Sequence, residues 1–184
     1  MDICLQLARF SAMETERLLL TPFRFSDEEA FWQISQSPSN VRFVFPSPKT
    51  KEESTMLMVT QFMKAPLGSW AIRLKQDDML IGMIRLEKLD WTKKTCEIGY
   101  LLKESEWGQG YMTESLKTIV FILFYECQLK SLHLIIHTEN KASQRVAQKA
   151  GFSLKRRYKG SDRYTHQVRT YLEFVLDRKD YTYE

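Results

Sequence analysis

Residues Cys96 to Glu114 read CEIGYLLKESEWGQGYMTE and are the most informative segment of the chain. Its first part predicts a strand over Thr95–Leu102. A helix begins at Gly110, where apolar residues start to recur every three or four positions as far as Cys127. The sequence therefore passes from a strand through a glycine-containing loop directly into the longest predicted helix of the chain.

The loop between the strand and the helix carries two glycines, Gly108 and Gly110. Glycine lets a backbone approach a ligand closely, and a helix start leaves N–H groups without internal acceptors. The positive end of the helix dipole lies there too, which favours an anion such as a pyrophosphate. A tight turn without any ligand explains a lone G-x-G equally well, and the loop matches neither of the standard phosphate-binding fingerprints.

Upstream of the loop, the pattern predicts a strand, several helices and then a meander. A capping box at Ser26 and Glu29 indicates one of the helix starts. The expected elements are a strand over Arg17–Phe25, helices ending at Ser35, starting at Pro38 and spanning Thr50–Lys64, and strands from Trp70 to Leu74 and over Leu80–Leu89.

Downstream, a short strand over Ser131–His137 leads into a helix over Asn140–Ala150 that stops at Gly151, the usual residue after a helix end. Two final strands follow, Leu154–Lys159 and Gln167–Leu176. This order predicts a mixed α/β fold, with an antiparallel meander that feeds a βαβ unit.

The composition bounds the class of protein. The chain has 184 residues, 43% apolar and 27% charged, as expected for one globular domain rather than a disordered chain. It contains no apolar run of the roughly 20 residues that span a bilayer, and residues 1–12 do not read as a signal peptide. The three cysteines form no metal-ligand or disulfide pattern, so we expect no metal and a cytoplasmic location.

The net charge of +4 is concentrated at the C-terminal end. From Lys149 to Glu184 there are nine Lys/Arg and five Asp/Glu. Such a segment can meet nucleic acid, an acidic protein or a phosphorylated cofactor, or it can simply be a solvated face.

A second constellation begins at Asn140 and reads NKASQRVAQKAGF. Asn140 is a good helix N-cap, and Ser143 lies one turn into the helix. A capped helix with a glycine stop, without a ligand, accounts for this segment when it is taken alone.

Together the two segments resemble the GNAT superfamily of acetyl-CoA-dependent N-acetyltransferases. The EIGYLL strand, the WGQGYMTE loop and helix, and the NxxSxxxxKAGF segment match in order and spacing. The opening ETERLLL from Glu14 looks like the branch of ribosomal-protein N-acetyltransferases (RimJ/RimL-like). The resemblance covers Met13 to Tyr181, so we expect residues 1–12 to be a tail and residues 13–184 to be a single N-acetyltransferase domain.

The resemblance implies a mostly antiparallel sheet of about seven strands, flanked by helices and splayed at a cofactor cleft. It also implies which residues bind acetyl-CoA. The strand backbone would pair with the pantetheine, the loop N–H groups would hold the pyrophosphate, Asn140 would bind the pantetheine, and Lys149 is a weaker phosphate candidate. The implied residues are Tyr100, Leu101, Leu102, Trp107, Gly108, Gln109, Gly110, Tyr111, Met112, Thr113, Asn140 and Lys149. One departure is Ser105, which stands where the superfamily usually has Gln or Arg.

The implied reaction needs a proton acceptor for the attacking amine and an acid near the departing sulfur. Glu97 is the candidate base because it alternates to the opposite strand face from Cys96 and Ile98 and matches a family position that is often acidic. A structural glutamate in a cross-strand pair is an equally good interpretation. Ser143 is the candidate acid, or it only orients the sulfur. Covalent catalysis by a cysteine is not expected, because Cys96 and Cys127 lie on apolar patterns.

Two functions remain open from the sequence. The first is direct acetyl transfer from acetyl-CoA to a primary amine, such as a protein N-terminal amine, in a ternary complex. The second is a non-catalytic CoA-sensing domain or a basic ribosome- or RNA-associated binding domain. We expect acetyl-CoA and an amine acceptor as partners, no membrane, no direct nucleic-acid binding, and a monomer or homodimer. His137 could line the acceptor cleft, although an ordinary surface position is more common for such a histidine.

Overall fold

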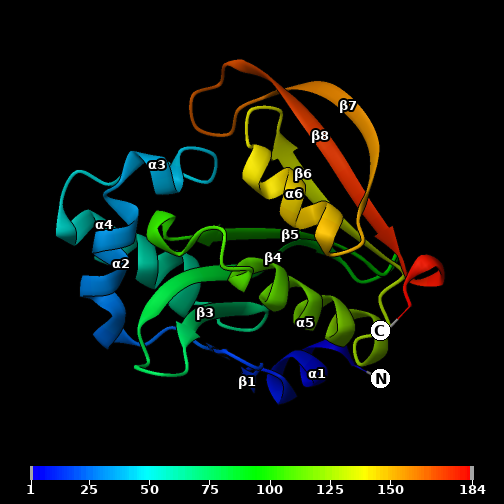
Figure 1. The fold of residues 1–184 in the computed structure, drawn as a ribbon, viewed down its shortest axis with the longest axis horizontal. Coiled ribbons are helices and arrows are strands. Elements are labelled where there is room, and N and C mark those ends of the chain that lie inside the picture. Colours follow the sequence, from blue (N-terminus) through cyan, green and yellow to red (C-terminus); the bar gives the residue numbers. More distant parts are fainter. Residues whose placement is uncertain (1, 183–184) are drawn as a thin grey trace.

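A computed structural model describes residues 2–182 as one mixed sheet with helices on both faces (Figure 1). Its eight strands are β1 (Met13–Glu14), β2 (Leu18–Thr21), β3 (Ser69–Leu74), β4 (Leu80–Asp90), β5 (Thr95–Leu102), β6 (Ser131–His137), β7 (Ser153–Ser161) and β8 (Val168–Asp177). Their order in the sheet is β1-β2-β3-β4-β5-β6-β8-β7, and every pair is antiparallel except β5–β6. The predicted fold class is confirmed. The two-residue β1, too short to leave a sequence pattern, makes eight strands rather than about seven.

The helices divide between two hydrophobic cores, one on each face of the sheet. The helical segments are α1 (Ile3–Arg9), α2 (Glu28–Ser35), α3 (Pro38–Val41), α4 (Lys51–Met58), α5 (Tyr111–Tyr125) and α6 (Lys141–Lys149), a π-helical turn Val59–Met63, and 3-10 turns at Phe25–Asp27, Glu104–Glu106 and Arg178–Asp180. The larger core contains buried residues of α1, α5 and α6, and the smaller one contains those of α2, α3 and α4. Figure 1 shows α5 and α6 side by side, with α2, α3 and α4 grouped at another side of the sheet.

The segment expected to be an N-terminal tail contains α1. Asp2 caps this helix by accepting a hydrogen bond from the Cys4 N–H at 2.7 Å. Ile3 and Leu7 are buried in the larger core, and the Trp70 indole donates to the Phe10 carbonyl oxygen at 3.0 Å. Residues 2–12 therefore contribute side chains to the core of the domain.

The capping box expected at Ser26 and Glu29 does not form, so this prediction is wrong. Residues Phe25–Asp27 form a 3-10 turn, and the Asp27 carboxylate accepts from the Arg24 N–H instead. Asp27 is buried and also binds the Arg73 guanidinium at 2.5 Å, with only 5% and 3% of the two side chains exposed. This tertiary ion pair takes precedence over the local sequence signal.

The feature that positions the site is the early separation of β5 from β6. These two parallel strands pair over only three positions, from Thr95 opposite Ser131 to Glu97 opposite His133. Beyond Glu97, β5 continues beside β4 as far as Leu102, while β6 continues beside β8. The sheet therefore opens between the two strands, and one backbone edge of β5 faces a gap rather than a neighbouring strand.

Candidate active site

One end of the site is the loop that precedes α5. Gly108 and Gly110 have φ of 80° and 85°, in the left-handed region that side chains disfavour. A Cβ at Gly108 would meet nothing within 4 Å, so the loop backbone is openly accessible. Gly110 is the N-cap of α5, and the N–H groups of the first helical turn, beginning at Tyr111, have no intrahelical acceptor. The loop thus forms an exposed cradle of N–H donors at a positive helix end.

Arg17 holds this cradle from outside. Its guanidinium donates to the Gln109 carbonyl oxygen at 2.9 Å and to the Glu114 carboxylate at 2.8 Å. It also lies over the Tyr111 ring, 4.5 Å from the centroid. Because Gln109 lies between the two glycines and Glu114 lies in the first turns of α5, Arg17 fixes the loop and the helix start in one arrangement.

The Glu114 carboxylate is the anchor of this contact. Burial opposes its ionisation, but hydrogen bonds from the Thr15 hydroxyl and from Arg17 outweigh burial, so the pKa of Glu114 lies below its usual value. Thr15 donates at 2.5 Å and the Arg17 backbone N–H at 2.9 Å. Glu114 therefore remains ionised at neutral pH and joins the N-terminal strands to α5.

The other end of the site is a cavity of about 720 Å³ in the opening between β5 and β6. Four of the predicted residues line it together: Glu97 and Tyr100 from β5, Asn140 before α6 and Ser143 in α6. The candidate base, the candidate acid and the two candidate pantetheine contacts thus share one space, although Tyr100 and Ser143 lie 43 positions apart in the sequence.

Glu97 lies on the cavity face of β5 with 18% of its side chain exposed. Its Oε2 accepts from Lys88 Nζ at 2.7 Å. Lys88 has a φ of 43° at a bulge where the β4–β5 register shifts. Glu97 Oε1 makes no hydrogen bond to any residue in the range 2–182, so it is available to a proton donor in the cavity.

Asn140 is the N-cap of α6, since its Oδ1 accepts from the Ser143 N–H at 3.1 Å. Its Nδ2 has no acceptor within the described chain and remains available in the cavity. The Ser143 carbonyl oxygen accepts from the Tyr100 hydroxyl at 3.2 Å. Burial raises the pKa of Tyr100, so the phenol stays protonated.

The other predicted cofactor residues fall into three groups. Trp107, Gly108, Gln109 and Gly110 are exposed along the cradle. Leu101, Leu102 and Met112 are buried in the cores, which leaves only their backbone for a ligand, and the Leu102 carbonyl oxygen already accepts from the Trp107 indole at 2.8 Å. Thr113 is half-buried in the first turn of α5, and Lys149 is exposed in the last turn of α6, outside the cavity lining.

The cysteines are unsuited to nucleophilic catalysis. Burial raises the pKa of Cys96 to about 12 and that of Cys127 to about 11. Cys4 is exposed on α1 and lies outside the cavity lining. Between residues 2 and 182, no group of three or more His, Cys, Asp or Glu side chains could hold a metal ion. No helix in the same range is long and apolar enough to cross a bilayer.

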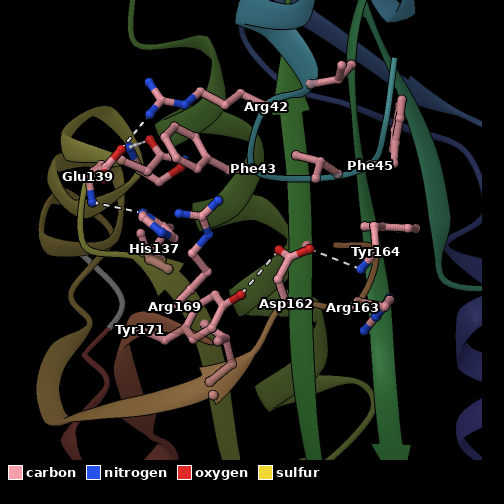
Figure 2. Close-up of a pocket in the computed structure, with 18 of the residues that line it drawn as sticks. Arg42, Phe43, Phe45, His137, Glu139, Asp162, Arg163, Tyr164, Arg169 and Tyr171 are labelled. Carbon is pink, nitrogen blue, oxygen red and sulfur yellow. Dashed lines mark hydrogen bonds and ion pairs between the residues drawn. The ribbon is translucent and has the colours of Figure 1, made fainter. Parts of the chain in front are cut away.

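Several residues that line the cavity away from α5 were not predicted from the sequence, apart from His137 (Figure 2). The rings of Phe43 and His137 stack at 5.2 Å, and His137 meets Tyr171 edge-on at 5.7 Å. Arg169 and Asp162 reach the same space from the β7–β8 hairpin. The sequence had indicated His137 as a residue that could line this part of the cavity. Arg17 was likewise present in the ETERLLL motif, but without an assigned role.

Comparison with known proteins agrees with this geometry. A profile of the acetyltransferase (GNAT) domain matches residues 17–153. An uncharacterised N-acetyltransferase of Bacillus subtilis, YnaD, is 30% identical over 137 residues, which cover 74% of this chain and 79% of the relative. The ribosomal-protein-serine acetyltransferase of Escherichia coli is 33% identical over 79 residues, 43% of this chain and 44% of that protein.

Solved structures show the same fold. A GNAT-family acetyltransferase from Bacillus anthracis superimposes with a TM-score of 0.81 at 22% identity, covering 91% of this chain and 99% of that one. The ribosomal-protein-S5-alanine acetyltransferase of Vibrio fischeri superimposes with a TM-score of 0.73 at 14% identity, covering 94% and 99%. The resemblance to the GNAT superfamily seen in the sequence is confirmed by the family match, and proteins named for ribosomal-protein acetylation are among those to which the chain is similar. The chain belongs to the GNAT acetyltransferase family and is an acetyltransferase.

Proposed function

We propose that the protein transfers an acetyl group from acetyl-CoA to a primary amine by direct attack within a ternary complex. The observation that carries this proposal is the opening between β5 and β6, which has the N–H cradle of α5 beside it and Glu97, Asn140 and Ser143 within it. Such an arrangement can hold both substrates close together in a reactive orientation. This supplies the part of the rate enhancement that comes from reduced translational and rotational freedom.

The residues fit the cofactor. At Gly108 the cradle leaves space for a diphosphate, and the α5 N-terminus favours its charge. The free edge of β5, from Ile98 to Leu102, can hydrogen-bond an extended amide chain as a neighbouring strand would. Bound acetyl-CoA would supply the activated acetyl thioester. Asn140 Nδ2 is a free donor for the pantetheine amides.

The proton steps are assigned to groups in the cavity. An acceptor amine must lose a proton to attack, and Glu97 Oε1 can take it directly or through a water. At the α6 side, the Ser143 hydroxyl lines the cavity and can donate to the departing sulfur. Tyr100 keeps its proton and holds the α6 start in place through the Ser143 carbonyl.

The acceptor class we favour is a protein N-terminal amine, because relatives named for ribosomal-protein acetylation share the branch. We propose a cytoplasmic location, which suits the three unpaired cysteines. A monomer or a homodimer fits this function.

Calorimetric titration with CoA and acetyl-CoA tests the cofactor half without knowledge of the acceptor. We expect saturable binding at one site, followed by acceptor-dependent release of free thiol with a panel of primary amines. Absence of CoA binding would overturn the proposal and leave the loop as a turn.

A basic binding domain is the second candidate, favoured by one observation. Lys155, Arg157 and Lys159 are exposed on β7 and have no carboxylate partner in the described structure. RNA affinity that falls steeply with salt would support this function, whereas weak and salt-indifferent binding would remove it.

A further inference from the structure

The acceptor end of the cavity has an aromatic wall made by Phe43, His137 and Tyr171. The His137 Nδ1 accepts from the Glu139 N–H at 3.1 Å, so the neutral imidazole carries its proton on Nε2. The Phe43 ring covers one face of the imidazole with an interplanar angle of 25°. This wall offers flat apolar surface, with few donors to fix a ligand's orientation.

Among the cationic side chains that line the cavity, all but one form an ion pair with a carboxylate of the lining. Three cationic side chains contact carboxylates of the same lining: Arg42 with Glu139 at 2.5 Å, Lys88 with Glu97 at 2.7 Å and Arg163 with Glu87 at 3.3 Å. The fourth, Arg169, donates to the Gln167 side-chain oxygen at 2.7 Å and has no carboxylate within ion-pair distance in residues 2–182. Its remaining N–H donors are therefore open to a ligand.

The lining offers Arg169 no internal partner. The nearby carboxylate of Asp162 is held by its own loop, accepting from the Tyr164 N–H at 3.0 Å and the Thr165 N–H at 2.7 Å. Figure 2 shows Asp162 turned toward Tyr164 and Tyr171, and the Arg169 guanidinium directed into the cavity beside His137. A guanidinium in such a position matches a planar carboxylate, which it can bind through two parallel hydrogen bonds.

We propose that Arg169 is a carboxylate subsite of the acceptor pocket and that the acceptor is a primary amine that also carries a carboxylate. This rests on the proposed acetyl transfer. The carboxylate binds Arg169, the body of the acceptor packs on Phe43 and Tyr171, and the amine end extends toward Glu97. Purely cationic amines such as polyamines are poor acceptors, because they bring no carboxylate to Arg169 and place ammonium groups near its guanidinium.

The test compares acceptors that differ only in the carboxylate. Alanyl-alanine is matched with alanyl-alaninamide, and spermidine represents a purely cationic amine. We expect wild-type kcat/KM, measured by thiol release at saturating acetyl-CoA, to be about tenfold higher for the acid than for the amide, as for a partly exposed charge-assisted contact. Spermidine should be the poorest acceptor.

Arg169→Gln should abolish this preference by lowering kcat/KM for the acid alone, and Arg169→Lys should restore part of it. Arg9→Gln is the matched control, since it removes an exposed arginine of α1 that lies outside the cavity lining. It should leave both values unchanged. A wild-type preference that survives in Arg169→Gln would overturn the subsite.

A binding measurement separates this proposal from the proposed function. Both dipeptides are titrated into the CoA-saturated protein by calorimetry, and the acid should bind about tenfold more tightly than the amide. Equal affinities overturn the subsite whether or not acetylation occurs. Failure of CoA itself to bind overturns the acetyl-transfer function, while titration of the CoA-free protein with the dipeptides still tests Arg169.

Discussion

Replacement of Arg17 by methionine removes the guanidinium that holds the phosphate cradle while keeping an unbranched side chain of similar length. The variant loses the hydrogen bond to the Gln109 carbonyl oxygen and the ion pair with Glu114. Glu114 still accepts from Thr15 and from the backbone N–H of residue 17, so its carboxylate is not left without partners. The fold should survive, and the loop should lose its fixed arrangement.

The expected loss of CoA affinity is modest because the side chains of Arg17 and Glu114 are partly exposed. Hydrogen bonds to charged groups contribute about 1.5–3 kcal/mol. The Arg17 side chain is 42% exposed and that of Glu114 is 18% exposed, so solvent screening reduces the value toward about 1 kcal/mol. At 1.4 kcal/mol per factor of ten, this weakens CoA affinity by about fivefold.

The assay is calorimetric titration with CoA and with pantetheine, which lacks the diphosphate. The Arg17→Met variant should bind CoA about fivefold more weakly than wild type and pantetheine equally well. Arg24→Met is the control, because Arg24 forms a similarly exposed ion pair with Asp78 away from the cradle. Unchanged CoA affinity, or an equal loss for both ligands, would refute the assigned role of Arg17.

The same contact predicts a pH dependence. The pKa of Glu114 is depressed in the folded protein, so its contribution is fully present above the ordinary glutamate pKa of about 4.3 and is lost as the pH falls through the lower folded value. The difference in CoA affinity between wild type and Arg17→Met should therefore shrink in acid below that range. A difference that persists unchanged after Glu114 is protonated would contradict the role of its carboxylate.

Three further changes test other parts of the site and fold. Gly110→Val should abolish CoA binding, since valine disfavours a φ of 85° and adds bulk at the cradle, and normal titration would refute this. Glu97→Gln should lower turnover at neutral pH by about 100-fold, with partial recovery at high pH where more of the acceptor amine is neutral, and a wild-type pH–rate profile would make Glu97 structural. Asp27→Asn should leave Arg73 as an uncompensated buried charge and destabilise the protein by about 3 kcal/mol. Its melting temperature should fall by about 6–12 °C, and a smaller shift in a thermal melt would show that the pair is well solvated.

The elements that sequence patterns predicted best are those that local chemistry determines. Asn140 caps α6 as expected because the cap depends on a side chain and an N–H three residues away. The start of α5 at Gly110 was predicted for a similar reason, because it depends on one residue: glycine alone adopts that backbone conformation without strain. The three motifs in register also led to the correct family.

Tertiary contacts account for what the patterns did not predict. Asp27 displaces the expected cap because Arg73, 46 positions away, requires a buried anion. The wall of Phe43, His137 and Tyr171 joins three segments that only the fold brings together, so no spacing in the sequence indicates it. The unpaired state of Arg169 is a property of its neighbours, and a linear pattern does not contain that information.

The three-residue pairing of β5 with β6 has a consequence for the mechanics of the protein. Because β5 and β6 pair over so short a length, β6, β8 and β7 are joined to the rest of the sheet by these three positions and by α5 and α6, which pack in the larger core. A ligand that hydrogen-bonds along the free edge of β5 would connect the two parts of the sheet where strand pairing is absent. Amide hydrogens of β5 and β6 should therefore exchange more slowly when CoA is bound, and the cofactor would complete the sheet as well as take part in the reaction.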